Sequence, residues 1–147
     1  FANAMDRFFL GDRDLAAMPS LQRAAFRAMG MADVTDAAHD LQVLEINAPF
    51  AHQLPMALEA LGLALPGRAG AFIDGGGLER HHVNPSVGML SGEPIMLGGL
   101  ARALSCVRQL RGDAGERQVR GAVRALATGS TGPAAQHQAV MILEAAL

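Results

Sequence analysis

The spacing of apolar residues predicts three helices in this chain of 147 residues. Between positions 15 and 31 the apolar side chains repeat every three or four residues and the arginines occupy another face, as in an amphipathic helix. A second helix is expected at 51–61. The longest helix is expected at 93–111, because a proline is well tolerated in its first turn and a glycine follows its last. Its expected buried face comprises Leu97, Leu100, Leu104, Val107 and Leu110.

Short apolar runs between these helices predict strands. Residues 41–46 are typical of a strand, and two closing strands are expected at 118–128 and 139–143, joined by a connection that begins with a Gly-Ser-Thr-Gly-Pro turn. A further short strand is expected at 70–73 within a glycine-dense stretch of loops, and residues 1–14 carry no clear pattern. This order predicts an α/β fold with a mixed sheet whose last two strands form an antiparallel pair.

Composition excludes several kinds of chemistry. Half of the residues are hydrophobic and 18% are charged, which supplies enough apolar surface for a packed core, and the length fits one domain. All 12 basic residues are arginine, so the chain has neither a Schiff-base amine nor a phosphate-loop lysine. The formal net charge is −2 and the arginines are dispersed, so we expect no binding to nucleic acid and no electrostatic attachment to a membrane.

The single cysteine and the histidines point away from redox and metal chemistry. Cys106 cannot form an intrachain disulfide or a cysteine metal cluster, so a reducing, cytoplasmic location is expected. It lies in the middle of a predicted helix, where a small buried residue is more usual than a nucleophile. Adjacent His81 and His82 cannot present two imidazoles to one metal from regular structure, so no metal site is expected. No apolar stretch is long enough to span a membrane.

Candidate binding residues lie in loops at the ends of the predicted elements. In open α/β sheets, ligands gather where strands give way to loops and helix N-termini. Four loops meet this description, at 47–50, 83–88, 91–94 and 127–132. Each of them alone is an ordinary turn sequence, so only their order and spacing along the chain indicate a function.

Taken in order, these loops resemble the motifs of thiolases. The run Glu45-Ile46-Asn47-Ala48-Pro49-Phe50-Ala51 resembles their Asn-Glu-Ala-Phe block, and 83–94 resembles their Asn-Pro-Ser-Gly-Gly segment leading into Gly-His-Pro. Residues 109–119 are similar to a Leu-Arg-Gly-x-Ala-Gly-x-Arg-Gln-Val stretch of the lipid-transfer (sterol-carrier-like) branch. The resemblance covers nearly the whole chain but only the C-terminal half of a thiolase. It implies that 1–147 is a single three-layer α/β/α domain with a mixed sheet, and that the N-terminal half with the nucleophilic cysteine is absent from this chain.

The resemblance also implies roles for individual residues. Asn47 matches an asparagine that holds a water, and Glu93 occupies the position of the Gly-His-Pro histidine, which activates the nucleophile and, with that water, forms an oxyanion site for the thioester carbonyl. The family's second cysteine, an acid/base in a Cys-x-Gly segment, falls at about 127–129, where this chain has no cysteine. Substrate contacts are expected from the same loops, at Asn84, Ser86, Gly88, Thr128 and Gly129.

The replacement of histidine by Glu93 changes the chemistry of the expected site. Histidine titrates near 6.5 and offers a donor beside an acceptor, whereas a glutamate titrates near 4.3 and, when ionised, only accepts. An anion facing a developing oxyanion would raise the barrier, although a buried, protonated Glu93 could donate a hydrogen bond or relay a proton. Glu93 could also simply cap the helix that follows it.

Two hypotheses of function remain open. In the first, the chain is the C-terminal portion of a thiolase-like acyltransferase or carbon–carbon lyase that takes a coenzyme A thioester as substrate and needs no other cofactor. In the second, it is a non-catalytic subunit that binds acyl-CoA or lipid, or that scaffolds an active partner. The partners implied are the N-terminal thiolase half, in cis or in trans, a second copy of the chain, and a small OB-fold protein. A lone half should expose apolar surface and self-associate.

Overall fold

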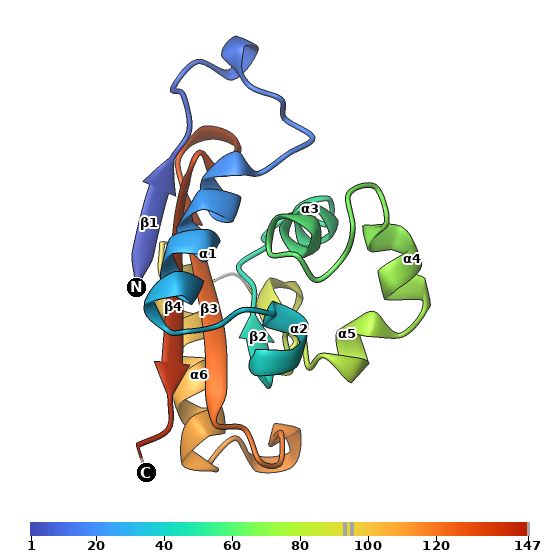
Figure 1. Ribbon diagram of the computed structural model, residues 1–147, viewed down its shortest axis with the longest axis vertical. Helices are drawn as coiled ribbons and strands as arrows, with labels where there is room; N and C mark the ends of the chain where they lie inside the picture. Colours follow the sequence, from blue (N-terminus) through green and yellow to red (C-terminus); the bar gives the residue numbers. More distant parts are fainter. Residues whose placement is uncertain (93, 95, 147) are drawn as a thin grey trace.

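A mixed four-stranded sheet forms the middle layer of the structure, a computed structural model that describes every residue except 93, 95 and 147 (Figure 1). The strand order is β1-β4-β3-β2; β2 runs parallel to β3, whereas β4 is antiparallel to both β3 and β1. The antiparallel pair of closing strands is therefore confirmed. The strands are β1 (Ala2–Met5), β2 (Val43–Glu45), β3 (Arg124–Thr131) and β4 (His137–Glu144).

Two long helices cover opposite faces of the sheet. Helix α1 (Pro19–Met31) packs on β1 and β4, and α6 (Gly98–Arg111) packs behind them on β3 and β2 (Figure 1). The short helices lie beyond β2: α2 (Ala37–Asp40), α3 (Gln53–Ala60), α4 (Ala69–Asp74) and α5 (Gly77–Arg80). The described residues also form 3-10 turns at Leu10–Asp12, Gly88–Ser91, Gly115–Arg117 and Pro133–Ala135. Among the described residues, no helix has the length and apolar character needed to cross a bilayer.

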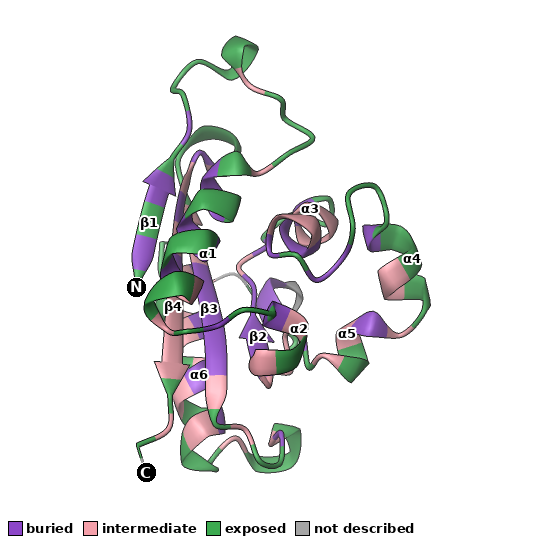
Figure 2. Cartoon of the chain, in the orientation of Figure 1, coloured by how far each residue is buried: buried purple, intermediate pink, exposed green. Residues whose placement is uncertain are grey.

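The alternation of side chains along β3 separates two hydrophobic cores. Leu126 joins the core beneath α1, where the helix contributes a stripe of small buried residues that includes Ala24 and Ala28. Ala125 and Ala127 face the other way and pack with α6. This period of two is what a strand buried on both faces requires. Figure 2 shows β3 in the middle of the sheet, and its residues 125–128 are buried.

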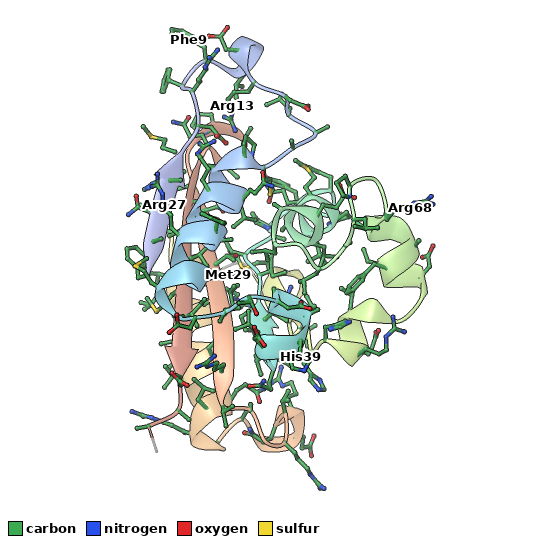
Figure 3. The ribbon with its side chains drawn as sticks, in the orientation of Figure 1. Phe9, Arg13, Arg27, Met29, His39 and Arg68 are labelled. Atoms are coloured by element: carbon green, nitrogen blue, oxygen red, sulfur yellow. The ribbon has the colours of Figure 1, made fainter. Side chains whose placement is uncertain are left out.

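The loop between β1 and α1 projects from the end of the sheet and is mostly exposed (Figures 1 and 2). Phe9, at its far end, is 71% exposed. Arg13 ties the loop to the β3–β4 turn, since its guanidinium donates to the carbonyl oxygens of Pro133 (3.0 Å) and Ala134 (2.9 Å) (Figure 3). Asp6, at the root of the loop, accepts a hydrogen bond from the backbone N–H of Ser20 and so satisfies the start of α1 (3.2 Å).

Several expectations from the sequence are corrected by the structure. Residues 70–73 belong to helix α4 instead of a strand, and the region 1–14, which lacked a clear pattern, supplies strand β1. The longest helix begins at Gly98, because Met96 has a left-handed backbone (φ 68°) that a helix cannot continue through. The expected strand 118–128 is shifted to 124–131.

The expected buried face of α6 is wrong in its main part. Leu97, Leu100 and Leu104 are 56%, 67% and 58% exposed and form an apolar strip on the outer side of the helix, called here the leucine face. The inner side instead buries Gly98, Arg102, Cys106 and Gln109. This side fits the sheet because its small residues let α6 approach β3 closely. Arg102 pairs there with the buried carboxylate of Glu45.

The contact between α6 and β3 is closest at two glycines. A Cβ placed on Gly99 would lie 3.0 Å from the Cα of Gly129, so helix and strand meet backbone to backbone. We expect Gly99→Val to lower the free energy of unfolding by about 2 kcal/mol, as overpacking does. Gly30→Val is the matched control, because an added Cβ there has nothing within 4 Å. Urea denaturation of both variants checks this; equal stability would show that the contact is not tight.

Candidate functional site

Asn47 lies at the carboxyl end of β2 and is held against β3 by two hydrogen bonds. Its backbone N–H donates to the hydroxyl of Thr128 (2.8 Å), and its Nδ2 donates to the hydroxyl of Ser130 (2.9 Å). Its Oδ1 is buried and has no hydrogen-bond partner among the residues that the structure describes. Asn47 and Thr128, 81 residues apart in sequence, are therefore in contact; most of the expected loop at 127–132 is the end of strand β3, which runs to Thr131.

The start of α6 reaches the same place. Gly99, in its first turn, packs on Gly129, the neighbour of Thr128. The amide groups of a helix N-terminus favour negative charge, so this end of α6 suits a developing anion. Glu93, the other expected catalytic residue, lies outside the described residues, and its role stays a prediction.

A buried ion pair lies behind this cluster. The Glu45 carboxylate, fully buried at the end of β2, accepts hydrogen bonds from the Arg102 guanidinium (3.1 Å) and from the Ser86 hydroxyl (2.7 Å) and backbone N–H (3.1 Å). Arg102 also donates to the Ser86 hydroxyl (2.8 Å). Burial raises the pKa of Glu45, and the bonds from Ser86 and the charge of Arg102 oppose that rise. The pair joins β2, α6 and the 84–88 loop at one point.

The predicted binding residues of the 84–88 loop all help to hold the loop in place. The Asn84 side-chain oxygen accepts from the Ile46 N–H (2.6 Å), and Ser86 binds Glu45. Gly88 is buried with φ 64°, and an added Cβ would lie 3.0 Å from the Asn84 amide, so the position needs glycine. Substrate contacts by these residues, and by the packed Thr128 and Gly129, stay predictions.

The described residues supply no activated thiol. Cys106 is fully buried in the core beneath α6, and this burial raises the pKa of its thiol to about 12. Ala127, within the segment where the resemblance places the family's Cys-x-Gly cysteine, packs in the same core. The described part of the chain contains no group of three or more metal-binding side chains.

An open, mainly apolar cavity of about 590 Å³ lies at the carboxyl end of β2, where Ala48 and Phe50, which follow Asn47 in sequence, line it. The start of α3, helix α5 and the segment 82–89 form its walls. Its lining residues are Ala48, Phe50, Ala51, Leu54, Leu78, Glu79, His82, Val83, Asn84, Pro85, Val87 and Met89.

Three residues of this region were not singled out from the sequence. Ser130 stood in a loop without a distinguishing feature. Glu45 and Arg102 did carry a signal, because each is a charge within an otherwise apolar strand or helix, and such charges are rarely buried without a partner. The sequence did not show that they pair, since 57 residues separate them.

The three layers and the polar cluster at the end of β2 define an α/β/α domain of the thiolase kind. The chain belongs to the thiolase C-terminal domain-like family, whose model matches residues 3–145. This confirms both the resemblance and the fold class.

Relatives in both the lipid-transfer and the acetyltransferase groups are much longer than this chain. Sterol carrier protein 2 of Oryctolagus cuniculus is 41% identical over 91 residues, which cover 59% of this chain and 17% of that protein. Acetyl-CoA acetyltransferase of Methanothermobacter thermautotrophicus is 38% identical over 117 residues, covering 75% of this chain and 29% of that protein. A solved structure titled "Ltp2-ChsH2(DUF35) aldolase" shares the fold, with a TM-score of 0.80 at 20% identity over 97% of this chain and 38% of that one.

Proposed function

We propose that the chain is the C-terminal portion of a thiolase-like enzyme that acts on acyl-CoA thioesters, as an acyltransferase or a carbon–carbon lyase. One observation carries the proposal: in a member of this family, the segments that match the Asn-Glu-Ala-Phe and Cys-x-Gly blocks meet through Asn47 and Thr128, beside the start of α6. The nucleophilic cysteine comes from an N-terminal thiolase half, since Cys106 is buried. A cytoplasmic location suits the single free thiol.

The geometry of Asn47 supports a water-binding role. A buried amide oxygen without a donor is costly, and a water would supply that donor once the close packing around Oδ1 opens enough to admit it. Ser130 and Thr128 fix the asparagine from both sides. A water held by the Oδ1 of Asn47 has its second hydrogen free, and it donates that hydrogen to the thioester carbonyl as negative charge develops on the oxygen.

Glu93 contributes to this reaction only in its protonated form. An ionised carboxylate beside the thioester oxygen would repel the developing charge, whereas a protonated one donates a hydrogen bond or passes a proton to the leaving thiol. Exclusion of bulk water from the assembled site would favour this neutral form, while the water held by Asn47 stays in place. Asn47 and Glu93 are therefore the proposed catalytic residues of this half.

The leucine face of α6 is the proposed contact with the N-terminal half. Leu97 precedes Gly99, the glycine of α6 that packs on Gly129, and Leu100 follows it, so a partner seated on these leucines would also lie close to the Asn47 cluster. A contiguous exposed apolar strip of this kind marks an interaction site. We propose a homodimer of the assembled protein, and an OB-fold protein as a further partner, on the family resemblance alone.

The alternative function is a non-catalytic subunit that binds acyl-CoA or lipid, or scaffolds an active partner. Two features of the family resemblance support it. By that resemblance, Glu93 stands in place of the activating histidine, and the segment 127–129, where the acid/base cysteine is expected, contains none; its Ala127 is a buried methyl group. A glutamate with its ordinary pKa is ionised near neutral pH and cannot donate a proton as histidine does, and alanine has no group that could transfer one.

Turnover by the chain assembled with an N-terminal half separates the two functions. We expect Glu93→Ala to lower the rate of thioester turnover by at least ~100-fold, the usual effect of losing a proton-transfer group. Glu116→Ala, which removes an exposed glutamate of the Gly115–Arg117 turn, should leave the rate unchanged. An unchanged rate in Glu93→Ala would remove Glu93 from the mechanism. No turnover with any acyl-CoA, in an assembly that forms stably, would favour the non-catalytic subunit.

A further inference from the structure

Three of the arginines that are dispersed in the sequence meet at a small cavity on the flank of α6. The cavity has a volume of about 230 Å³. Its lining residues are Ser86, Arg102, Ser105, Arg108, Gln109, Ala114 and Arg117. No acidic side chain is among these described lining residues, so the cavity is a candidate site for an anion.

Two walls of this cavity are fixed to each other by hydrogen bonds. One wall is α6, where Ser105 and Arg108, three positions apart, lie side by side. The other wall is the segment that follows α6. Gln109 ties this segment to the helix, since its Nε2 donates to the carbonyl oxygen of Arg117 (2.7 Å). The Arg117 guanidinium in turn donates from Nη1 to the carbonyl oxygen of Ser86 (3.2 Å). The walls therefore need little ordering when an ion binds.

The unused polar groups of the cavity are hydrogen-bond donors. Arg102, whose side chain is 7% exposed, donates only from Nη1, to the Glu45 carboxylate that neutralises it and to the Ser86 hydroxyl. Its Nε is enclosed and has no partner among the described residues, so Nη2 is the group left for a ligand. The Arg108 guanidinium and the Ser105 hydroxyl likewise form no hydrogen bond with the described residues. An anion accepts from all of these donors, whereas a cation would be repelled by the guanidinium groups.

The net charge of the cavity comes from Arg108 and Arg117. Neither forms a salt bridge with any residue that the structure describes, and Arg102 is already paired. Asp113 and Glu116 belong to the same part of the chain, but they are exposed and do not line the cavity, so water and salt screen their charges. Two uncompensated positive charges suit an anion that carries two negative charges.

We propose that this cavity, called here the arginine pocket, binds a phosphate group, either as the free ion or as part of a small phosphorylated molecule. A guanidinium presents paired N–H donors that match two oxygens of such a group, which is why arginine is common in phosphate sites. The exposed side chains of Arg108 and Arg117 admit the group from solvent, and Arg102 and Ser105 add donors from α6. Phosphate binding here is independent of the thioester chemistry proposed at Asn47.

Titration of the full chain with sodium phosphate at pH 8, followed by the backbone amide NMR signals of residues 102–117, tests this binding. At constant ionic strength, phosphate should bind at least ~10-fold more tightly than acetate, because it carries nearly two charges and has more acceptor oxygens. Glycerol 3-phosphate that binds as tightly as inorganic phosphate would assign the pocket to a phosphorylated molecule, whereas binding of inorganic phosphate alone would assign it to the free ion. Equal affinities for phosphate and acetate, or signals that do not change, would overturn the proposal.

Variants of exposed and half-buried residues locate the ion without disturbing the Glu45 ion pair. Arg108→Gln and Arg117→Gln should each weaken phosphate binding at least ~5-fold, through the loss of a charge-assisted hydrogen bond. Ser105→Ala removes a donor without changing the charge and should weaken binding about 3-fold. Arg120→Gln is the matched control: it removes the same charge from an exposed residue that does not line the pocket, and the affinity should change less than ~2-fold. An equal loss in Arg120→Gln and Arg108→Gln would show a general attraction to positive charge and overturn the pocket.

Discussion

Arg102→Met should lower the free energy of unfolding by about 3–5 kcal/mol, because it leaves the Glu45 carboxylate buried without its cation. The methionine fills much of the arginine's volume, so the lost stability is due mainly to the missing positive charge. Arg108→Met, on the exposed side of α6, is the matched control and should cost less than about 0.5 kcal/mol. Chemical denaturation of the three proteins measures these differences.

The double variant Glu45→Gln/Arg102→Met gives the sharper test of the same pair. With both charges removed, no uncompensated ion is buried, so the double variant should be more stable than Arg102→Met alone. A double variant that loses the sum of the two single losses would show that Glu45 and Arg102 do not interact in solution.

The loss of stability in Arg102→Met should also depend on pH. Burial raises the pKa of Glu45 in the folded state, and loss of the opposing charge of Arg102 raises it further above the unfolded value. Above that raised pKa, the folded variant loses stability because it must hold Glu45 ionised and buried. This loss disappears as the pH falls to the ordinary glutamate range, where Glu45 is protonated in both the folded and the unfolded chain. We expect a smaller difference from the unaltered chain near pH 5 than near pH 8.

The isolated chain should self-associate through the leucine face, and Leu100→Glu/Leu104→Glu should weaken that association at least ~100-fold. Burying a leucine contributes about 1.5–3 kcal/mol, so two of them account for an effect of this size. Both side chains are more than half exposed, so the folded chain tolerates the charges. Sedimentation velocity over a range of concentrations measures the change.

A control for this result changes exposed apolar residues elsewhere. Phe26 and Leu65 are 79% and 75% exposed and lie outside α6, so Phe26→Glu/Leu65→Glu should associate like the unaltered chain. An unaltered chain that remains monomeric at every concentration, or a control that dissociates as fully as the leucine-face variant, would contradict the assignment of this face as an interface. The same leucine-face variant should fail to assemble with an N-terminal thiolase half.

The candidate site was predictable from the sequence in part. The resemblance to thiolases implied that Asn47 and the 127–129 segment belong to one site, and the structure brings Asn47 and Thr128 into hydrogen-bond contact. The environment of Asn47 was not predictable, since it depends on Ser130 and on the packing of Gly99 against Gly129. These contacts join residues far apart in the chain, which a local pattern does not record.

Local patterns by themselves determined the α/β class, helix α1, strand β2 and the antiparallel closing pair, because periodicity and turn residues act over a few positions. Only the tertiary structure decided which side of α6 faces the sheet. Leucines are the most apolar part of that helix, yet they lie outside, because the small residues of β3 and the buried carboxylate of Glu45 accept glycine and Arg102 instead. An amphipathic pattern shows that a helix has an apolar face, but which neighbour covers that face is decided by the surfaces that meet in the fold.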